Sequence, residues 1–408
     1  MRLASYIASR IFSNSNQHLS SPIIRIAVLS VATGIAVMII SIAIVVGFKN
    51  QIRDKVIGFI APIKVEVLDN NASLESKPLT YSPDLKDIID QIEGISHAQG
   101  VIFKPTLVKT GDQIQGIVLK GVGSDYDWKY FEDKLVKGEI PDIQDTTKTD
   151  QVLISKKIAS KLLLKVGDPM RCWFVSSDQT QARGRKLFVS GIYETGLLEF
   201  DQVYAFADVK HLQKLNNWSD NQYSTIEVLI NNIKDAGIIN DRLYNELPVD
   251  LVSKTVREQF PQIFDWLDLQ DMNVIIIIVL MILVSGITMI GTLLIIILER
   301  TSMIGLLKAL GATNHLIRSI FHSLSLSILL RGLVIGNLVG IGFCILQSKF
   351  GIIKLPTDSY YLSEVPIDLT FWQILSVNVG TLILWAIMLY IPVTIINRIN
   401  PSKSIRFD

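Results

Sequence analysis

The sequence predicts a membrane protein in which four transmembrane helices carry one large α+β domain, inserted between the first and second helices. Apolar residues make up 49% of the 408 residues, and the mean hydropathy is positive, at +0.38. These residues gather in four blocks with almost no charged side chains, and each block exceeds the roughly 20 residues that a helix needs to cross a bilayer. The blocks are residues 26–48, 272–298, 319–348 and 369–397.

The first block is expected to remain in the protein as a membrane anchor. Its apolar core is longer than the h-region of a signal peptide, and no A-x-A cleavage pattern follows it.

Lysine and arginine residues near the span ends predict the orientation, because they gather on the cytoplasmic side of a membrane. Segments 1–25, 299–318 and 398–408 should therefore be cytoplasmic, which puts the domain 49–271 and the loop 349–368 outside. The basic residues are Arg2, Arg10, Arg25, Arg300, Lys308, Arg318, Arg398, Lys403 and Arg406. Lys49, Arg53 and Lys55 run against this pattern, with Asp54 partly offsetting them, and we interpret them as helix that continues beyond the membrane.

The domain 49–271 alternates strand-like and helical patterns. Ser82 and Ser155 are each expected to cap a helix, and Gly111 and Asp112 to form the turn of a hairpin. A second hairpin is expected from strands 170–175 and 186–193, around the polar loop 176–185. The segment after Val256 should lead helically into the second span. The domain holds one cysteine, Cys172, and the other, Cys344, lies in the third span, so the domain must be stabilised by packing rather than by an internal disulfide.

A search for catalytic or ligand motifs finds none. The five histidines, His18, His97, His211, His315 and His322, show no metal-ligand spacing, and no G-x-x-x-x-G-K-[ST] loop is present to hold a nucleotide. A net charge of +1 gives no bulk electrostatic attraction for nucleic acid. The chain is therefore expected to be a non-catalytic subunit without a metal or cofactor of its own.

The stretch LERTSMIGLLKALGAT, residues 298–313, predicts a short amphipathic helix after the second span. Met303, Ile304, Leu307 and Leu310 fall on one stripe of this helix, and Gly311 stands where a left-handed C-cap is favoured. Such a helix could rest on lipid headgroups or dock a cytoplasmic partner, and the residues alone leave both interpretations open.

A family resemblance favours the docking helix. ERTSMIGLLKALGAT resembles the coupling helix of FtsX/MacB-like ABC-transporter permeases, and NPSKSIRFD resembles their terminal motif, with Ser404 in place of the usual alanine. Within that family, VVGFKNQI, LASYIASRIF and the loop FGIIKLPTDSYYLSEVPIDLTFWQ resemble the LolC/LolE lipoprotein-releasing permeases. Two further positions depart from the pattern: Thr288 replaces an asparagine, and Met303 replaces an acidic residue.

The resemblance implies a permease subunit of the bacterial inner membrane, with its large domain in the periplasm, that extracts lipoproteins for a periplasmic carrier. Its implied partners are a LolD-like ATPase that binds ATP and Mg, a second permease subunit (identical or related), the lipoprotein cargo, membrane lipid and a LolA-like carrier. No cofactor is implied in this chain. The alternatives are a MacB-like efflux permease and an FtsX-like scaffold that relays ATPase motion to a cell-wall hydrolase.

The resemblance also implies three groups of site residues. The ATPase-coupling residues are Met303, Ile304, Gly305, Leu307, Lys308, Ala309 and Gly311. The lipid cavity would be lined by Val45, Val46, Phe48, Val274 and Ile277, with Tyr360 and Tyr361 at the membrane interface, although ordinary lipid-facing surface would use the same residue types. Arg183 and Arg185 would contact the carrier, although the loop 176–185 lacks an apolar tip and also fits a solvated hairpin.

Arg331 lies in the third span, where burying a charged side chain in the bilayer costs free energy. The role of Arg331 stays open. Gly332, Gly336 and Gly340 form a small-residue stripe that predicts close helix packing.

Overall fold

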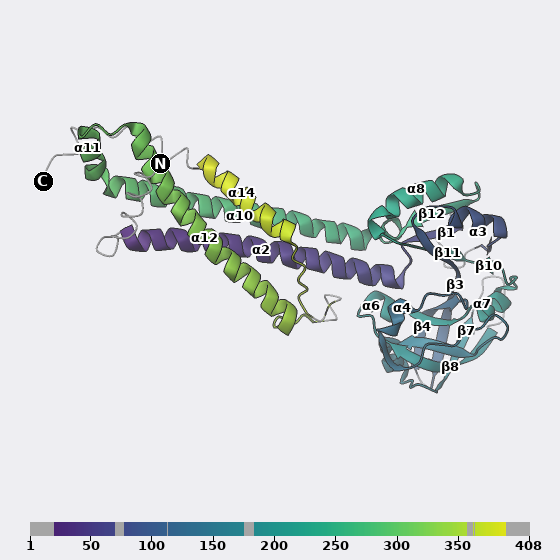
Figure 1. Ribbon diagram of the computed structural model, residues 1–408. Coiled ribbons are helices and arrows are strands. Elements are labelled where there is room, and N and C mark those ends of the chain that lie inside the picture. The colour runs from purple at the N-terminus through teal and green to yellow at the C-terminus, as the bar shows by residue number, and fades with distance from the viewer. Residues whose placement is uncertain are drawn as a thin grey trace. The chain divides into compact units, whose positions relative to one another are not determined.

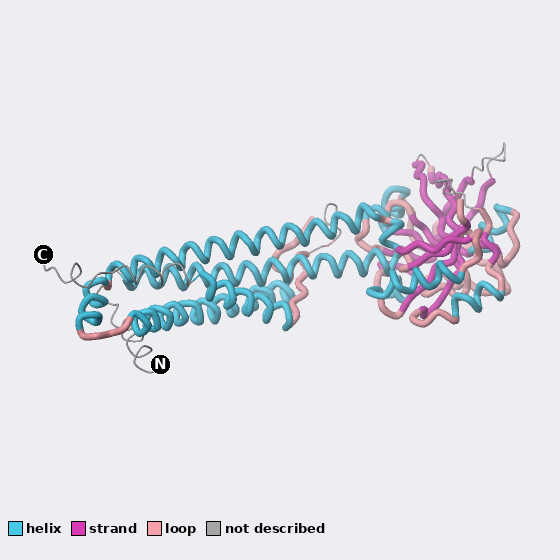
Figure 2. The backbone as a smooth tube through the Cα atoms, turned by 90° about the horizontal axis from the view of Figure 1, so that it is seen from above, coloured by secondary structure: helices cyan, strands magenta, loops and turns pink. Residues whose placement is uncertain are grey.

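The computed structural model describes residues 20–69, 77–111, 113–174, 183–356, 362 and 364–388. The chain divides into two compact units. We call residues 1–51, 266–355 and 364–408 the helical unit, and residues 52–265 with 356–363 the sheet unit. The ten-stranded sheet and the short two-stranded sheet belong to the sheet unit, whereas the helical unit is built from long helices (Figure 2).

Four helices in the described part of the chain are long and apolar enough to cross a membrane. They are α2 (Ser20–Phe59), α10 (Pro261–Glu299), α12 (Asn314–Phe350) and α14 (Phe371–Met388), and the short helix α11 (Thr301–Ala309) joins α10 to α12 (Figure 1). The first three extend beyond the predicted spans at both ends, so those spans are the apolar centres of longer helices. The predicted end of the fourth span, 389–397, and the tail 398–408 lie outside the described residues.

The predicted glycine stripe is confirmed as the contact between α12 and α2. Gly332, Gly336 and Gly340 are all buried. A Cβ atom added to Gly336 would lie 2.7 Å from the Ala32 carbonyl oxygen and 2.8 Å from the Ile35 Cβ, and one at Gly332 would lie 2.6 Å from Val31. The backbones of the two helices therefore approach more closely than any residue with a side chain would allow.

Polar side chains add specific links within the helical unit. The amides of Asn337 on α12 and Asn378 on α14 donate to each other, at 2.8 and 3.0 Å, and each also donates to a carbonyl one turn earlier in its own helix. Ser285 on α10 donates to the Ser30 carbonyl of α2 at 3.4 Å. Hydrogen bonds of this kind satisfy polar groups that lipid cannot solvate.

The sheet unit is built on a mixed sheet with strand order β12-β1-β11-β3-β4-β9-β6-β8-β5, in which β7 also pairs with β3 and β8. The pairs β4–β9 and β6–β8 are parallel, and the other pairs are antiparallel. The strands are β1 (Ile63–Val67), β3 (Ile95–Thr110), β4 (Gln113–Val122), β5 (Leu135–Gly138), β6 (Gln151–Ser155), β7 (Pro169–Phe174), β8 (Arg183–Tyr193), β9 (Tyr204–Asp208), β11 (Thr225–Ile230) and β12 (Leu251–Thr255). β2 (Leu79–Thr80) and β10 (Gln222–Tyr223) form a separate two-stranded sheet.

Two apolar clusters fill the sheet unit. One cluster packs α3 and α8 against β1, β11 and β12 (Figure 1), and the other packs α5 and α7 against β4 and β6 to β9. The helices are α3 (Pro83–Asp90), α4 (Lys129–Glu132), α5 (Lys156–Leu162), α6 (Leu198–Asp201), α7 (Val209–Asn216), α8 (Ala236–Glu246), α9 (Val256–Gln259) and the 3₁₀ turn η2 (Ile233–Asp235).

Several local predictions for this unit are confirmed. The Ser82 and Ser155 hydroxyls accept from the backbone N–H groups of Leu85 and Ile158, as N-caps do. Both predicted hairpins form, as β3–β4 and β7–β8. The helical lead into the second span is confirmed from Pro261 onward, because α10 runs unbroken from there through the span. It is interrupted only at Phe260, between α9 and α10, because Pro261 disfavours helical backbone in the residue before it.

The C-terminal end of α2 lies in an aromatic cluster of the sheet unit. Phe59 is 2% exposed, and its ring lies 5.0 Å from that of Phe200 and 5.8 Å from that of Phe131, measured between centroids. The preceding Gly58 lies against the Tyr130 ring, where a Cβ atom would collide with it. The last turn of α2, which belongs to the sheet unit, is therefore fixed by packing within that unit.

A buried ion pair connects the strands on either side of β3. Lys120 on β4 lies 2.6 Å from Glu227 on β11, and both side chains are almost fully inaccessible, at 1% and 4%. Gln99 on β3 donates to the second Glu227 oxygen at 2.9 Å, and Lys120 donates to the Tyr126 hydroxyl at 3.2 Å. The Lys120 ammonium also lies 5.6 Å from the ring centroid of Phe206. Burial lowers the pKa of Lys120, and the attraction of Glu227 opposes that shift.

Removing one member of this pair should destabilise the sheet unit strongly. Lys120→Met leaves the Glu227 carboxylate buried without its cation, which costs about 3–5 kcal/mol in comparable buried pairs. The double variant Lys120→Met with Glu227→Leu leaves no uncompensated charge and should recover most of that loss. Thermal unfolding of the purified chain measures both variants, and equal stability of the single and double variants would contradict this account.

Adding one methyl group at the helix contact should destabilise the helical unit. Gly336→Ala forces its Cβ against Ala32 and Ile35, and we expect a loss of about 1–3 kcal/mol, typical of overpacking. Gly342→Ala on the same helix is the matched control, because its Cβ would meet no atom within 4 Å. The melting temperature in detergent should fall for the first variant and hold or rise for the second.

Candidate functional site

The helix α11 is closed at its C-terminal end by the predicted glycine cap. Gly311 has a φ of +92°, a backbone conformation that favours glycine. Its N–H donates to the Lys308 carbonyl at 3.0 Å, and the Ala312 N–H donates to the Leu307 carbonyl at 2.9 Å. Thr313 then caps α12 by accepting from the Leu316 N–H. The link from α11 to α12 is therefore short and held by several hydrogen bonds, which restricts the direction of α11.

The predicted stripe of α11 divides between a buried and an exposed side. Ile304 is fully buried and Gly305 is buried. Ile304 packs in a cluster formed by α2, α10 and α12, whose other members are Ile24, Ala27, Ile296, Ile297, Ile317, Phe321, Leu324 and Ile328. Met303 and Leu307 are half-buried against Ile320. Leu310, in contrast, is 77% exposed.

Apart from Ser302, the exposed side of α11 is apolar. It consists of Ser302, Leu306, Ala309 and Leu310, followed by Gly311. Leu306 is 56% exposed. Sequence reasoning missed Leu306, because the buried cluster that decides which side of α11 faces outward comes from three other helices. Of the predicted coupling residues, Ala309 and Gly311 are exposed, and Met303, Leu307 and Lys308 are half-buried.

At the other end of the helical unit, Gly47 and Asn50 hold the loop that precedes α14. A Cβ atom on Gly47 would lie 2.8 Å from both the Pro366 carbonyl oxygen and the Asp368 backbone nitrogen. The Asp368 N–H donates to the Ala43 carbonyl at 3.0 Å, and the Asn50 amide donates to the Asp368 carboxylate at 2.6 Å. The end of the first predicted span and residues 366–368 thus meet in space.

The neighbouring residues Phe48 and Lys49 join α2 to α10. The Phe48 ring lies 5.6 Å from the Trp266 ring in an edge-to-face arrangement. The Lys49 ammonium lies 2.6 Å from Asp271 and 3.5 Å from Asp268. These two carboxylates neutralise one of the cations that run against the predicted orientation.

The side chain of Gln347 organises the start of the same loop. It donates to the carbonyls of Ile353 and Val365, both at 3.1 Å, and accepts from the Ile353 N–H at 2.9 Å. Tyr360 and Tyr361, predicted at the membrane interface, lie outside the described residues.

The predicted cavity residues lie along α2 and α10. Val45, Val46, Phe48 and Ile277 are half-buried, and Val274 is 9% exposed. None of them lines the cavity found among the described residues of the helical unit. Their role in lipid binding stays a prediction.

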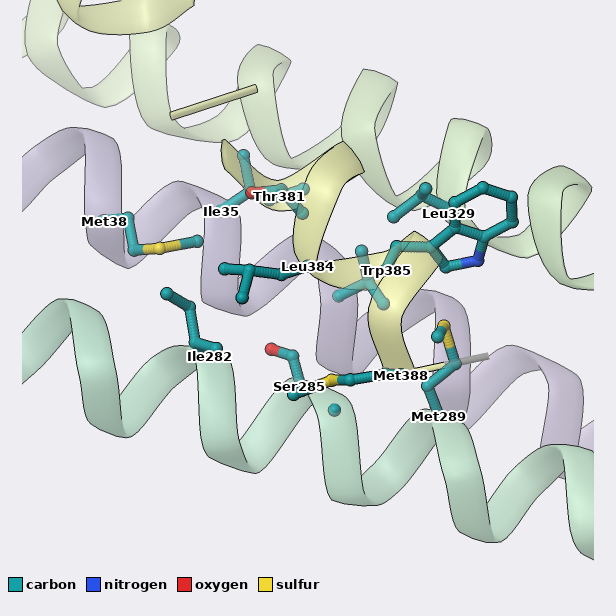
Figure 3. A pocket seen from close by; sticks show the side chains of 12 residues that line it. Ile35, Met38, Ile282, Ser285, Met289, Leu329, Thr381, Leu384, Trp385 and Met388 are labelled. Atoms are coloured by element: carbon teal, nitrogen blue, oxygen red, sulfur yellow. The ribbon is translucent and has the colours of Figure 1, made fainter. Parts of the chain in front are cut away.

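That cavity lies between α2, α10, α12 and α14 and measures about 40 Å³ (Figure 3). This volume suits a water molecule or two rather than an acyl chain. The lining is apolar apart from the Ser285 and Thr381 hydroxyls, and consists of Val31, Ile35, Met38, Ile282, Ser285, Gly286, Met289, Leu329, Thr381, Leu384, Trp385 and Met388. A Cβ atom on Gly286 would collide with Met388.

The predicted carrier residues Arg183 and Arg185 begin strand β8. Arg183 is exposed and donates to the Leu215 carbonyl at 3.3 Å, and Arg185 is half-buried. Residues 175–182, most of the predicted loop, lie outside the described residues.

The face of the sheet opposite to these two arginines exposes large apolar side chains. Trp173 is 42% exposed and Phe188 is 41% exposed, and Leu107, paired with Trp173 across β3 and β7, is 48% exposed. The cations Arg171 and Lys186 lie on the same face, opposite each other in register. The sequence of β7, PMRCWF, could have predicted this exposed face, because every second residue of the strand is exposed.

The described residues contain no cluster of three or more histidine, cysteine or acidic side chains that could hold a metal. Cys172 and Cys344 are free and buried. Burial raises the pKa of the Cys172 thiol to about 12, so this thiol stays protonated and unreactive at neutral pH.

Four membrane-length helices, a short helix between the second and third of them, and a sheet unit inserted between the first and second define a membrane protein of the permease class. The comparison with family models agrees: the FtsX-like permease C-terminal model matches residues 275–401, and the MacB-like periplasmic core domain matches residues 26–243, more than half of the chain. The chain belongs to the FtsX/MacB-like permease family.

Curated relatives resemble the chain along nearly its whole length. The lipoprotein-releasing system transmembrane protein LolC of Xylella fastidiosa (strain 9a5c) is 22% identical over 94% of this chain and 93% of that protein. LolE of Haemophilus influenzae is 22% identical over 93% of each chain. Among solved structures, the periplasmic region of MacB from Actinobacillus actinomycetemcomitans matches 50% of this chain and 92% of its own, with a TM-score of 0.34 and 10% identity.

Substituting Gly47 should release the loop before α14. In Gly47→Ala the new Cβ must displace Pro366 and Asp368, which breaks the hydrogen bond from the Asp368 N–H to Ala43. We expect hydrogen–deuterium exchange in residues 364–370 to accelerate at least about tenfold, corresponding to roughly 1.4 kcal/mol of lost protection. Gly291→Ala, which meets no atom within 4 Å, is the control, and unchanged exchange in Gly47→Ala would refute the contact.

Proposed function

We propose that this chain is the permease subunit of an ABC transporter that extracts lipoproteins from the inner membrane and passes them to a periplasmic carrier. The observation that carries this proposal is the similarity to LolC and LolE along more than nine-tenths of the chain, through the spans, the sheet unit and α11 together. The proposed orientation has both termini and α11 in the cytoplasm and the sheet unit in the periplasm. It rests on the distribution of basic residues and on the MacB-like periplasmic core match.

Energy would enter through α11. An ATPase in a separate chain would bind ATP and Mg, and its surface would cover the exposed side formed by Ser302, Leu306, Ala309 and Leu310. Two leucines more than half exposed are costly on a surface that meets only water. The buried side of α11 has the complementary role, because Ile304 touches a cluster shared by α2, α10 and α12. A displacement of α11 would therefore move three spanning helices together.

The cargo cavity would form with a second permease subunit, identical or related. Moving an acyl chain out of the bilayer costs about 0.8 kcal/mol per methylene, which an apolar cavity must offset until ATP hydrolysis closes it. The cavity of about 40 Å³ inside this chain is too small for that purpose. We assign the cavity instead to the ends of α2 and α10 nearest the sheet unit in sequence, near Val45, Val46, Phe48, Val274 and Ile277, where a partner permease would complete it.

The carrier would contact the sheet unit at the face of β3, β7 and β8. This face combines Trp173, Phe188 and Leu107 with the cations Arg171 and Lys186. Arg183 and Arg185 lie on the same strand, β8, but alternate with the residues of this face and so point to the opposite side of the sheet. Exposed aromatic side chains with arginine nearby are typical of protein interfaces.

The proposal is tested by purifying the tagged chain in detergent with whatever it binds. Wild type should bring down a small ATPase and acylated proteins. The double variant Leu306→Gln with Leu310→Gln should weaken ATPase association by roughly tenfold to a hundredfold, since each interface leucine contributes about 1 kcal/mol or more. Leu68→Gln with Val249→Gln removes two apolar side chains of the sheet unit that are 59% and 95% exposed, and should change nothing.

Two outcomes would overturn the proposal. Recovery of a cell-wall hydrolase without acylated protein would favour an FtsX-like scaffold, and ATP-dependent export of a small molecule would favour a MacB-like efflux permease. ATPase association that survives the α11 variant would remove α11 as the coupling element.

A further inference from the structure

An open groove of about 480 Å³ runs along one edge of the large sheet. It is formed by the edge strand β5, the helix α5 and the turn that follows α5. Its lining residues are Val136, Lys137, Gly138, Lys156, Ala159, Ser160, Leu164, Lys165, Val166 and Ile192. None of these residues belongs to the coupling, cavity or carrier surfaces described above.

Strand β5 is paired on one side only. It lies at the end of the strand order and pairs with β8 through Leu135–Tyr193, Lys137–Ile192 and Gly138–Gly191. No described strand lies on its other side. The outer edge of β5 therefore presents backbone N–H and C=O groups that an added strand could pair with.

The groove is positively charged. Lys137 comes from β5, Lys156 from α5 and Lys165 from the turn after α5, and no acidic residue lines the groove. Lys156 lies 2.8 Å from Glu194, but no described carboxylate lies within 4.0 Å of the Lys137 or Lys165 ammonium. A single lysine on an edge strand protects against unwanted pairing. Lys137 and Lys165, which come from two different elements around one groove, indicate, in addition, an anionic occupant.

Apolar side chains accompany these cations. Leu164 and Ile192 form a buried floor, at 5% and 8% exposure, while Val136 and Val166 are exposed at 44% and 41%. An anionic lipid headgroup or a free phosphate would leave these valines in water. A peptide strand would cover them, because its side chains alternate between two faces.

We propose that this groove binds an extended, acidic polypeptide segment of a periplasmic protein, which adds as a strand beside β5. Its backbone would pair with the outer edge of β5, its apolar side chains would cover Val136 and Val166, and its carboxylates would meet Lys137 and Lys165. The inference rests on the proposed function only in placing the sheet unit in the periplasm.

The test measures binding of a fluorescein-labelled octapeptide of alternating glutamate and valine to the purified full chain, by fluorescence anisotropy. Wild type should bind this peptide, and should not bind the matching peptide of lysine and valine. Lys137→Glu with Lys165→Glu should weaken binding at least tenfold. Lys86→Glu with Lys234→Glu, which makes the same charge change on exposed residues of α3 and η2, should bind as wild type does.

Two further probes separate strand addition from plain charge attraction. Methylation of alternate backbone amides of the peptide should abolish binding, because it removes the hydrogen-bond donors but keeps every charge. Lys137→Gln with Lys165→Gln should give an intermediate loss. Thermal unfolding of each variant shows that it is folded.

Binding that tolerates amide methylation, or an equal loss in the Lys86 and Lys234 control, would overturn the proposal. So would vesicles of phosphatidylglycerol that bind the full chain through Lys137 and Lys165 while the acidic peptide does not. ATPase recovery and lipoprotein recovery are separate measurements, so failure here leaves the proposed function standing, and failure of the proposed function leaves peptide binding measurable.

Discussion

The described helices of the helical unit all pack against α2 or against a cluster that α2 shares. Near its middle, the backbone of α12 approaches α2 at Gly332, Gly336 and Gly340, a distance that no larger residue allows. Further along, Gly47 accepts the loop before α14 with similarly little space, and Lys49 binds α10 through two carboxylates. Close approach replaces the hydrophobic effect as the source of stability here, because lipid solvates apolar surface as well as a neighbouring helix does.

The parts of the fold that the sequence predicted well are those set by local chemistry. A block of apolar residues longer than the bilayer predicts a span whatever its neighbours are. The caps at Ser82, Ser155 and Gly311 were predictable because each depends on hydrogen bonds within one turn. The glycine stripe of α12 was predictable for a related reason: residues four apart lie on one helix face. The interruption of the helix at Phe260 was not predicted, although Pro261 indicates it, because the residues on both sides have a helical pattern.

Contacts between distant segments could not be predicted. No residue pattern near Lys120 in the sequence predicts its ion pair with Glu227, and none near Lys49 predicts its ion pair with Asp271. The candidate coupling site shows the same limit. Its helix, its cap and its apolar stripe were predicted, but the assignment of Ile304 to the inside and of Leu306 and Leu310 to the outside depends on how three other helices pack. The family resemblance identified α11 as the candidate coupling helix, but only the fold shows which of its faces is exposed.

This division of α11 bears on how a small helix can act on the rest of the unit. A helix that rests on the surface could rotate or slide without disturbing its neighbours. The side chain of Ile304, in contrast, is enclosed by residues of α2, α10 and α12. Replacing a buried isoleucine by alanine lowers the free energy of unfolding by about 2–5 kcal/mol. Displacing α11 alone would withdraw Ile304 from this cluster and leave a cavity, at a cost in free energy of similar size. Moving it together with the three helices opens none. The glycine contacts of α12 with α2 and the amide pair of Asn337 and Asn378 resist separation of the helices from one another. Force applied to the leucine face of α11 is therefore most easily accommodated by movement of the packed helices as a group. The proposed ATPase partner would need motion of this kind in order to act at a distance.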